Sequence, residues 1–275
     1  MDAKASIGVF DSGYGGLTVF DKIQQVVPSY NYIYLGDNAR APYGSRSFEL
    51  VYRFTLQAVE RLFDEGCRLV ILACNTASAK ALRSIQQKDL PRIDPERRVL
   101  GVIRPTVEVL DGLSRSKHVG VLGTNGTISS GSYAMEIQHL FPQIQVTGEA
   151  CPMWVPLVEN GEAASPGADY FIRQHIERIF ARDPLIDTLV LGCTHYPLLI
   201  PKIRRYLPEG VRLFPQGDRV AESLADYLRR HPEMDSRLGK DGRHRILTTE
   251  SAEKFSRTAS LFFPWTGRVE QITLA

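Results

Sequence analysis

The 275-residue sequence lacks several features that would narrow its function at once. No apolar run approaches the roughly 18 residues that span a bilayer, and no apolar signal-peptide region follows Met1. We therefore expect neither a membrane partner nor secretion. The formal net charge is only +2, which argues against a nucleic-acid partner because nucleic-acid-binding proteins carry strong basic patches.

Cysteine is also scarce, and none of the four cysteines belongs to a CxxC pair; they are Cys67, Cys74, Cys151 and Cys193. That spacing does not predict a metal site. Unpaired cysteines without a secretory signal predict a reducing, cytoplasmic setting. The glycine-rich segment 11–16 (DSGYGG) lacks the GxGxxG pattern of a dinucleotide site.

Two similar stretches stand out in what remains. Residues 70–78 (VILACNTAS) and 189–197 (LVLGCTHYP) each contain a short apolar run, a small residue, a cysteine and a polar residue. Such runs predict buried parallel strands. Each cysteine would then lie at a carboxyl strand end, where open α/β sheets bind ligands. We hypothesise that Cys74 and Cys193 face each other across one substrate.

The rest of the chain alternates between strand and helix patterns, which predicts an α/β fold. A helix is expected after Cys74, with Asn75, Thr76 or Ser78 as its cap. A strand is expected at 98–103, an apolar loop at 151–161 and a mobile loop at 232–245. Residues 119–127 repeat the strand-and-turn pattern of 7–13, so two related halves are expected. We place the first domain at 1–98 plus 211–275 and the second at 99–210.

Two thiols at matched strand ends suit the inversion of a carbon stereocentre. This reaction removes a proton from one face and delivers another to the opposite face, and a thiol with a pKa of about 8.5 can do either. His195 lies two residues after Cys193, and Asp11 ends a strand expected beside that of Cys74. Glu159 is a candidate for a partly buried carboxylate.

Other interpretations of these residues remain open. Buried cysteines often serve as small apolar side chains, and Cys193 could instead be a nucleophile with His195 as its base. Asp11 could be a helix cap or turn residue, and Glu159 a capping or surface acid.

Five motifs in combination resemble those of the bacterial glutamate racemases, within the aspartate/glutamate racemase superfamily. They are 10–16 (FDSGYGG), 41–44 (APYG), 73–78 (ACNTAS), 155–159 (VPLVE) and 192–197 (GCTHYP). The resemblance covers essentially the whole chain. It implies two doubly wound α/β domains related by a pseudo-twofold axis, with the active site between them. It also implies cofactor-independent interconversion of L- and D-glutamate, which supplies D-glutamate for peptidoglycan, and a homodimer.

The resemblance assigns roles to residues of this sequence. Cys74 would act on the D-enantiomer with help from Asp11, and Cys193 on the L-enantiomer with help from His195 and with Glu159 nearby. The residues expected to bind substrate are Asp11, Ser12, Tyr43, Gly44, Asn75, Thr76, Thr194 and His195, with Thr124 and Thr127 as further contacts for a carboxylate.

Two positions depart from the pattern of these racemases. Arg104 and the segment 215–217 stand where acidic residues are usual, and we expect them to affect domain contacts or an oligomer interface rather than the reaction. Two alternative functions remain: racemisation of aspartate or another amino acid, and non-catalytic binding of an amino acid.

Overall fold

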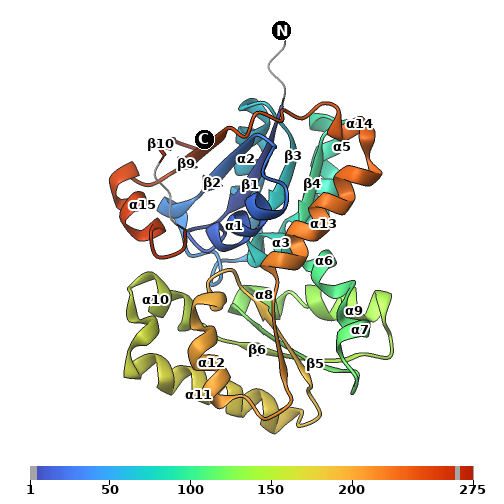
Figure 1. The fold of residues 1–275 in the computed structure, drawn as a ribbon, viewed down its shortest axis with the longest axis vertical. Helices are drawn as coiled ribbons and strands as arrows, with labels where there is room; N and C mark the ends of the chain where they lie inside the picture. The colour runs from blue at the N-terminus through green and yellow to red at the C-terminus, as the bar shows by residue number, and fades with distance from the viewer. Residues whose placement is uncertain (1–4, 264–266, 275) are drawn as a thin grey trace.

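The computed structural model describes residues 5–263 and 267–274. Within these ranges the chain forms two parallel β-sheets, one above the other in Figure 1. The larger sheet has the order β10-β9-β2-β1-β3-β4 and the smaller one β6-β5-β7-β8. The strands of the larger sheet are β1 Ser6–Asp11, β2 Tyr32–Gly36, β3 Cys67–Leu72, β4 Arg98–Gly101, β9 His244–Thr248 and β10 Val269–Gln271. Those of the smaller sheet are β5 His118–Gly123, β6 Gln145–Ala150, β7 Thr188–Gly192 and β8 Arg212–Pro215.

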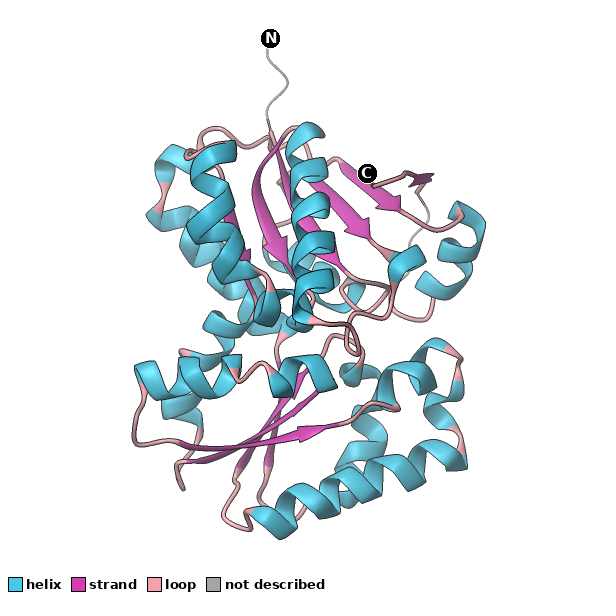
Figure 2. Cartoon of the chain, turned by 180° about the vertical axis from the view of Figure 1, so that it is seen from behind, coloured by secondary structure: helices cyan, strands magenta, loops and turns pink. Residues whose placement is uncertain are grey.

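Helices cover both faces of each sheet (Figures 1 and 2). Those around the larger sheet are α1 Leu17–Val26, α2 Phe48–Asp64, α3 Asn75–Lys80, α4 Leu82–Ser84, α5 Leu90–Ile93, α13 Gly217–Arg230, α14 Pro232–Asp235 and α15 Ala252–Ala259. Those around the smaller sheet are α6 Ile103–Val107, α7 Leu110–Leu113, α8 Asn125–Ser129, α9 Ser132–Leu140, α10 Trp154–Glu159, α11 Pro166–Arg182 and α12 Ile200–Tyr206. Short non-α turns are η1 Asn38–Arg40, η2 Ile85–Asp89, η3 Glu162–Ala164 and η4 Tyr196–Leu199.

Alternation along the strands explains why each sheet is covered twice. In β1, Ile7 and Val9 pack with α1 and α13 in one core, whereas Phe10 packs with α2 in another. In β7, Leu189 and Val190 likewise divide between two cores. Successive side chains of a strand point to opposite faces, so an apolar strand needs a helix on each side. The predicted α/β class with doubly wound parallel sheets is confirmed.

The chain leaves the larger sheet after residue 98, the predicted first boundary, and returns to it after residue 210, the predicted second boundary. β4 pairs with β3 of the larger sheet, and β8 pairs with β7 of the smaller one. Boundaries after 98 and 210 therefore cut off part of β4 and assign β8 to the wrong sheet. A short apolar strand carries no local signal for its pairing partner. We propose crossings near 102 and 216, between β4 and α6 and between β8 and α13.

Three local predictions also need correction. The strand expected at 98–103 ends at Gly101, and α6 begins two residues later. The expected loop at 151–161 contains α10, which buries Trp154, Val155 and Val158 at helical spacing. Pro156 obscured that spacing, although proline is tolerated in the first turn of a helix.

The expected mobile loop at 232–245 is instead tied to the larger sheet. It begins with α14, and Leu238 is buried in the core beside α13. Main-chain hydrogen bonds join Ala5 N to Arg237 O, and Gly239 N to Ala5 O. The many charged residues of this segment face outward. Its composition therefore suggests a mobile loop and gives no sign that Leu238 is buried.

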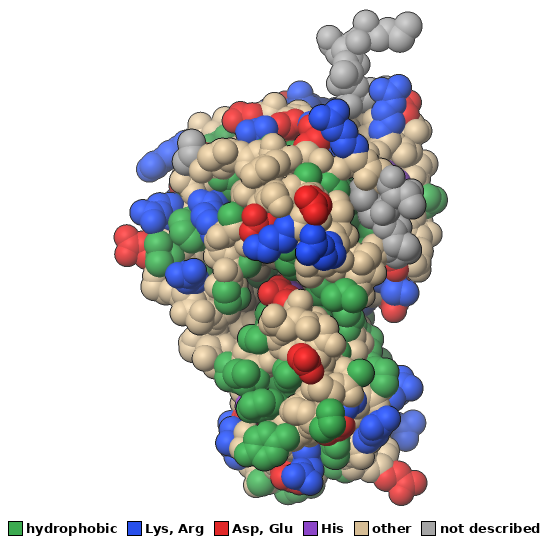
Figure 3. Space-filling view, turned by 90° about the vertical axis from the view of Figure 1, so that its left-hand side faces the viewer, with side chains coloured by type: hydrophobic (Ala, Val, Ile, Leu, Met, Phe, Trp, Pro, Cys, Tyr) green, Lys and Arg blue, Asp and Glu red, His purple; other side chains and the backbone are tan. Residues whose placement is uncertain are grey.

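The surface is mixed in charge on the side shown in Figure 3. There, basic and acidic side chains alternate over the part that holds the larger sheet, and hydrophobic side chains gather on the other part. In the described ranges, no helix is both long enough and apolar enough to cross a bilayer.

Candidate active site

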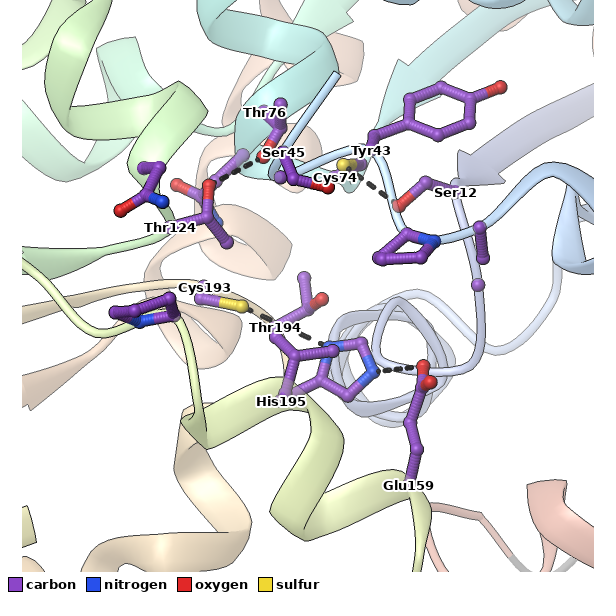
Figure 4. A pocket seen from close by; sticks show the side chains of 18 of the residues that line it. Ser12, Tyr43, Ser45, Cys74, Thr76, Thr124, Glu159, Cys193, Thr194 and His195 are labelled. Carbon is purple, nitrogen blue, oxygen red and sulfur yellow. Dashed lines mark hydrogen bonds and ion pairs between the residues drawn. The ribbon is translucent and has the colours of Figure 1, made fainter. Parts of the chain in front are cut away.

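A cavity of about 200 Å³ lies between the two sheets, at the carboxyl ends of β1, β3, β5 and β7. Open α/β sheets bind ligands in this position, in the crevice outside the carboxyl ends of their strands. The predicted residues that line it are Ser12, Tyr43, Gly44, Cys74, Asn75, Thr76, Thr124, Glu159, Cys193, Thr194 and His195. In Figure 4, Cys74 and Cys193 lie on opposite sides of this space.

Cys74 leaves the end of β3 and begins α3. Its Sγ accepts a hydrogen bond from Ala77 N at 3.4 Å, so the thiol itself caps the helix instead of the predicted Asn75, Thr76 or Ser78. Ser12 Oγ lies 3.3 Å from the same sulfur. Burial raises the pKa of Cys74 to about 12, the charge of Asp11 adds to this, and the contacts with Ser12 and Ala77 oppose it. The free thiol is therefore protonated at neutral pH.

Asp11 is fully buried behind this thiol and does not line the cavity. Its Oδ2 accepts a hydrogen bond from Gly13 N at 3.0 Å, within the turn that leads to α1. Burial raises the pKa of the Asp11 carboxyl, while the His195 charge and the Gly13 amide oppose the shift. The charge of Asp11 thus raises the pKa of Cys74. Asp11 also precedes Ser12, whose hydroxyl contacts the Cys74 sulfur.

Cys193 follows β7 and faces a histidine that is held from its other side. Cys193 Sγ lies 3.9 Å from His195 Nδ1, and His195 Nε2 lies 2.8 Å from Glu159 Oε1 (Figure 4). Burial by itself lowers the pKa of His195, yet the contacts with Cys193 and Glu159 raise it to about 10. An imidazolium is therefore the neutral-pH form, and a cation beside a cysteine favours its thiolate.

The turn after β1 packs closely against the segment that follows Cys193. A Cβ added to Gly15 would lie 2.3 Å from Thr194 Oγ1 and 2.4 Å from His195 Nδ1. Thr18 Oγ1 also donates a hydrogen bond to Thr194 O at 3.0 Å. The glycine is required here because no side chain fits between the turn and the imidazole.

Three threonines meet where the loops of the two sheets come together. Thr76 Oγ1 lies 2.9 Å from Thr124 Oγ1 and 3.3 Å from Thr127 Oγ1. Thr124 caps α8 by accepting from Thr127 N, and Thr127 does not line the cavity. Gly126 N donates to Gly44 O at 2.7 Å, which fixes the 41–47 loop against the smaller sheet.

The side chain of Tyr43 points away from the cavity. Its hydroxyl donates to Asp37, and its ring packs in the core beneath α2. Only the main chain at Tyr43 and Gly44 is left to meet a ligand. The sequence pattern pointed to this loop correctly, but it could not show that the tyrosine anchors the loop from behind.

Sequence reasoning missed the residues that hold Asn75. Asn75 Nδ2 donates to Gln216 Oε1 at 2.8 Å, and Tyr133 OH donates to Asn75 Oδ1 at 2.6 Å. The sequence marks Gln216 only as part of a departure from the racemase pattern, and it gives no sign that Tyr133 belongs to the site. Nothing near these positions in the sequence signals the contact, since Gln216 is 141 residues from Asn75.

Known proteins resemble the chain over nearly its full length. Residues 7–223 match the model of the Asp/Glu/Hydantoin racemase family. The glutamate racemase of Roseobacter denitrificans is 40% identical over 267 residues, which cover 94% of this chain and 96% of that protein. Glutamate racemase RacE1 from Bacillus anthracis superposes with a TM-score of 0.89 at 33% identity, covering 98% of both chains. The Francisella tularensis glutamate racemase, solved in complex with D-glutamate, has a TM-score of 0.87 at 30% identity, again over 98% of both chains.

The family match spans more than half of the chain, and the sequence identity to the Roseobacter denitrificans protein extends across both sheets. The chain therefore belongs to the Asp/Glu/hydantoin racemase family.

Proposed function

We propose that the chain is a glutamate racemase, an isomerase that interconverts L- and D-glutamate by moving the α-proton between two thiols. The observation that carries this proposal is the placement of Cys74 and Cys193 on opposite sides of one cavity, each at the end of a strand from a different sheet. The glutamate racemases reported above, which resemble the chain over nearly its whole length, support glutamate as the substrate.

The two thiols begin in different protonation states under this proposal. Protonated His195 stabilises the Cys193 thiolate, which removes the α-proton of L-glutamate. Cys74 keeps its proton because burial raises its pKa, and it delivers that proton to the opposite face of the α-carbon. The product is D-glutamate, with Cys193 as a thiol and Cys74 as a thiolate. Reversal of these steps converts D- to L-glutamate, and the route uses no cofactor.

The cavity stabilises the transition state mainly with neutral groups. Among the described lining residues His195 is the only basic side chain and Glu159 the only acidic one. We propose that substrate carboxylates and ammonium are bound by Ser12, Asn75, Thr76, Thr124 and Thr194 together with the main chain at 43–44. Preorganised donors in a site closed to water stabilise the negative charge that develops at the α-carbon.

Three further parts of the proposal concern the setting of the enzyme. We propose a cytoplasmic location, which the four free cysteines support because such thiols persist in a reducing compartment. We propose that the product D-glutamate enters peptidoglycan, as is typical of the family. The proposal of a homodimer rests on the resemblance alone, and light scattering of the purified protein tests it.

The experiment that tests the function uses the purified protein in deuterated water without added cofactor. L-Glutamate and L-aspartate are incubated separately, and circular dichroism is followed together with α-deuterium incorporation. Loss of optical activity with deuterium uptake is expected on glutamate only. The same result on aspartate alone would replace the proposed substrate. Glutamate binding without exchange would leave a binding protein, and a covalent adduct on Cys193 would favour a thiol nucleophile.

A further inference from the structure

Gln216 lies at the point where the chain returns from the smaller sheet to the larger one. It follows β8 and immediately precedes α13, and its residue is only 4% exposed. Its side chain meets three others that come from separate parts of the fold: Asn75 of α3, Thr106 of α6 and Tyr133 of α9. One buried side chain therefore touches the candidate site and both crossings between the sheets.

The hydrogen bonds around Gln216 permit only one direction of donation. Thr106 Oγ1 donates to Val102 O at 2.8 Å, so it can only accept from Gln216 Nε2, which lies 2.8 Å away. This fixes the amide of Gln216 with Oε1 toward Asn75. Asn75 must then donate through Nδ2, at 2.8 Å.

Tyr133 completes the network and removes the remaining freedom of Asn75. The Tyr133 hydroxyl accepts from Gln216 Nε2 and donates to Asn75 Oδ1 at 2.6 Å. All of these side chains are buried, and buried polar groups in a fully satisfied network have few alternative arrangements. The orientation of the Asn75 amide therefore depends on a chain of hydrogen bonds. The chain starts at the main-chain carbonyl of Val102 and runs through Thr106 and Gln216 to Asn75.

This orientation decides what Asn75 offers to a ligand. Its Oδ1 accepts from Tyr133 and one N–H donates to Gln216, and a substrate carboxylate can only accept, so it needs an N–H. The second N–H remains, and Asn75 lines the cavity. We propose that Gln216 is a positioning residue that makes Asn75 present an N–H donor, rather than its carbonyl oxygen, to a carboxylate of the substrate. This inference rests on the proposed function and adds a residue to it.

The alternative is that Gln216 only braces the two crossings. A double-mutant cycle separates the two roles, because a residue that acts through Asn75 has no effect when Asn75 is already truncated. Gln216→Leu is expected to raise KM for glutamate about tenfold with kcat little changed, the pattern for loss of a binding hydrogen bond. In an Asn75→Ala background, Gln216→Leu is expected to leave KM within about twofold of the Asn75→Ala value. An equal fold-change in both backgrounds, or an unchanged KM in folded Gln216→Leu, overturns the proposal.

Two further variants protect the test against simple misfolding. Tyr133→Phe removes the donor to Asn75 Oδ1 without shortening a side chain, and the same rise in KM is expected. Gln24→Leu is the matched control: Gln24 Nε2 lies 2.7 Å from His244 Nδ1 on the far part of the larger sheet, and its loss should leave KM unchanged. If Tyr133→Phe keeps the wild-type KM, Asn75 is not held in the way proposed.

A second readout separates this inference from the proposed function. D-Glutamate binding to each variant is measured by titration calorimetry. A wild-type protein that binds glutamate without inverting it refutes the racemase proposal, yet weaker binding by Gln216→Leu still supports the role of Gln216. A wild-type protein that inverts glutamate, with Gln216→Leu unchanged in KM and in affinity, refutes the role of Gln216 alone. A wild-type protein that does not bind glutamate overturns both.

Discussion

Oε1 of Glu159 lies 2.8 Å from Nε2 of His195, although α10 and the end of β7 reach the cavity from different parts of the smaller sheet. The carboxylate leaves Nδ1 of the same ring to face Cys193. His195 is thus charged at neutral pH, with a pKa of about 10. The thiol and the carboxylate are coupled through one imidazole, which gives this side of the cavity a pH dependence of its own.

Glu159→Gln should weaken this coupling while nearly preserving shape. Loss of the negative charge removes one of the two interactions that raise the pKa of His195, so that pKa should fall toward its ordinary value. Less imidazolium means that less of the cation beside Cys193 is present at neutral pH. We expect kcat/KM for L-glutamate to fall roughly tenfold at neutral pH, and an NMR titration of His195 measures the change in pKa directly.

A second histidine–glutamate pair provides the control for this variant. His175 Nδ1 lies 2.7 Å from Glu149 Oε1, and neither residue lines the cavity. Glu149→Gln should leave the pH profile of turnover unchanged. A Glu159→Gln protein with a wild-type His195 titration would contradict the role assigned to Glu159.

Replacement of either active-site thiol should abolish inversion without unfolding the protein. Cys74→Ser and Cys193→Ser each remove one of the two acid–base groups, because an alcohol is far too weak an acid to replace a thiol. Racemisation in both directions is expected to fall by about a thousandfold. Circular dichroism on L- and D-glutamate measures the rates, and thermal melting confirms that each variant is folded.

Cys67 serves as the matched thiol outside the cavity. It is fully buried at the start of β3, in the core beneath α2. Cys67→Ala should reduce stability modestly and leave turnover unchanged. Turnover near the wild-type rate in either Cys74→Ser or Cys193→Ser would rule out the two-thiol route.

Gly15→Ala tests how tightly the turn after β1 holds the Cys193 side. The added methyl group would need the space of Thr194 Oγ1 and His195 Nδ1, so the imidazole must leave its place beside Cys193. Misplacement of a catalytic group by about an ångström costs roughly a hundredfold in rate, and kcat/KM for L-glutamate measures it. Gly112→Ala is the control, because a Cβ at Gly112 meets no atom within 4 Å. Equal kinetics in the two variants would mean that the imidazole tolerates the shift.

The main features of the site could be predicted because parallel strands align their carboxyl ends. Cys74 and Cys193 each follow an apolar run, and that pattern predicts each thiol at the carboxyl end of its own strand, where ligands bind. The proximity of Asp11 to the Cys74 strand followed from the same logic, since β1 pairs with β3. The α/β class needed only the alternation of strand and helix patterns.

The contacts between distant segments could not be predicted in this way. Asn75 meets Gln216 and Tyr133 only because the two sheets face each other, and no local pattern records that arrangement. The cap of α3 was missed because cysteine is not among the residues that usually cap helices. The sequence pattern predicts Tyr43 as a ligand contact but carries no sign that its hydroxyl anchors the loop on Asp37.

The pKa of His195 also makes stability depend on pH. The pKa is about 10 in the folded protein and 6.5 in an exposed histidine, so the folded state holds this proton more tightly. The resulting stabilisation is fully present below pH 6.5 and is lost as pH rises toward 10. Cys67 and Cys74, whose pKa values burial raises from 9.0 to about 12, lower stability only above pH 9. The interval between pH 6.5 and 9 therefore reports on His195 rather than on these thiols.

Melting temperatures across that interval test the assignment. On unfolding, His195 releases its proton and the proposed Cys193 thiolate takes one up, so wild-type stability should stay nearly level between pH 6.5 and 9. Cys193→Ser has no thiolate to take up a proton, so its stability should fall as pH rises above 6.5 for as long as Glu159 holds the imidazolium. Cys67→Ala is the control and should keep the wild-type curve below pH 9, because the Cys67 thiol is protonated in both states there. A wild-type curve that falls as steeply as that of Cys193→Ser would show that Cys193 is not a thiolate in the folded protein.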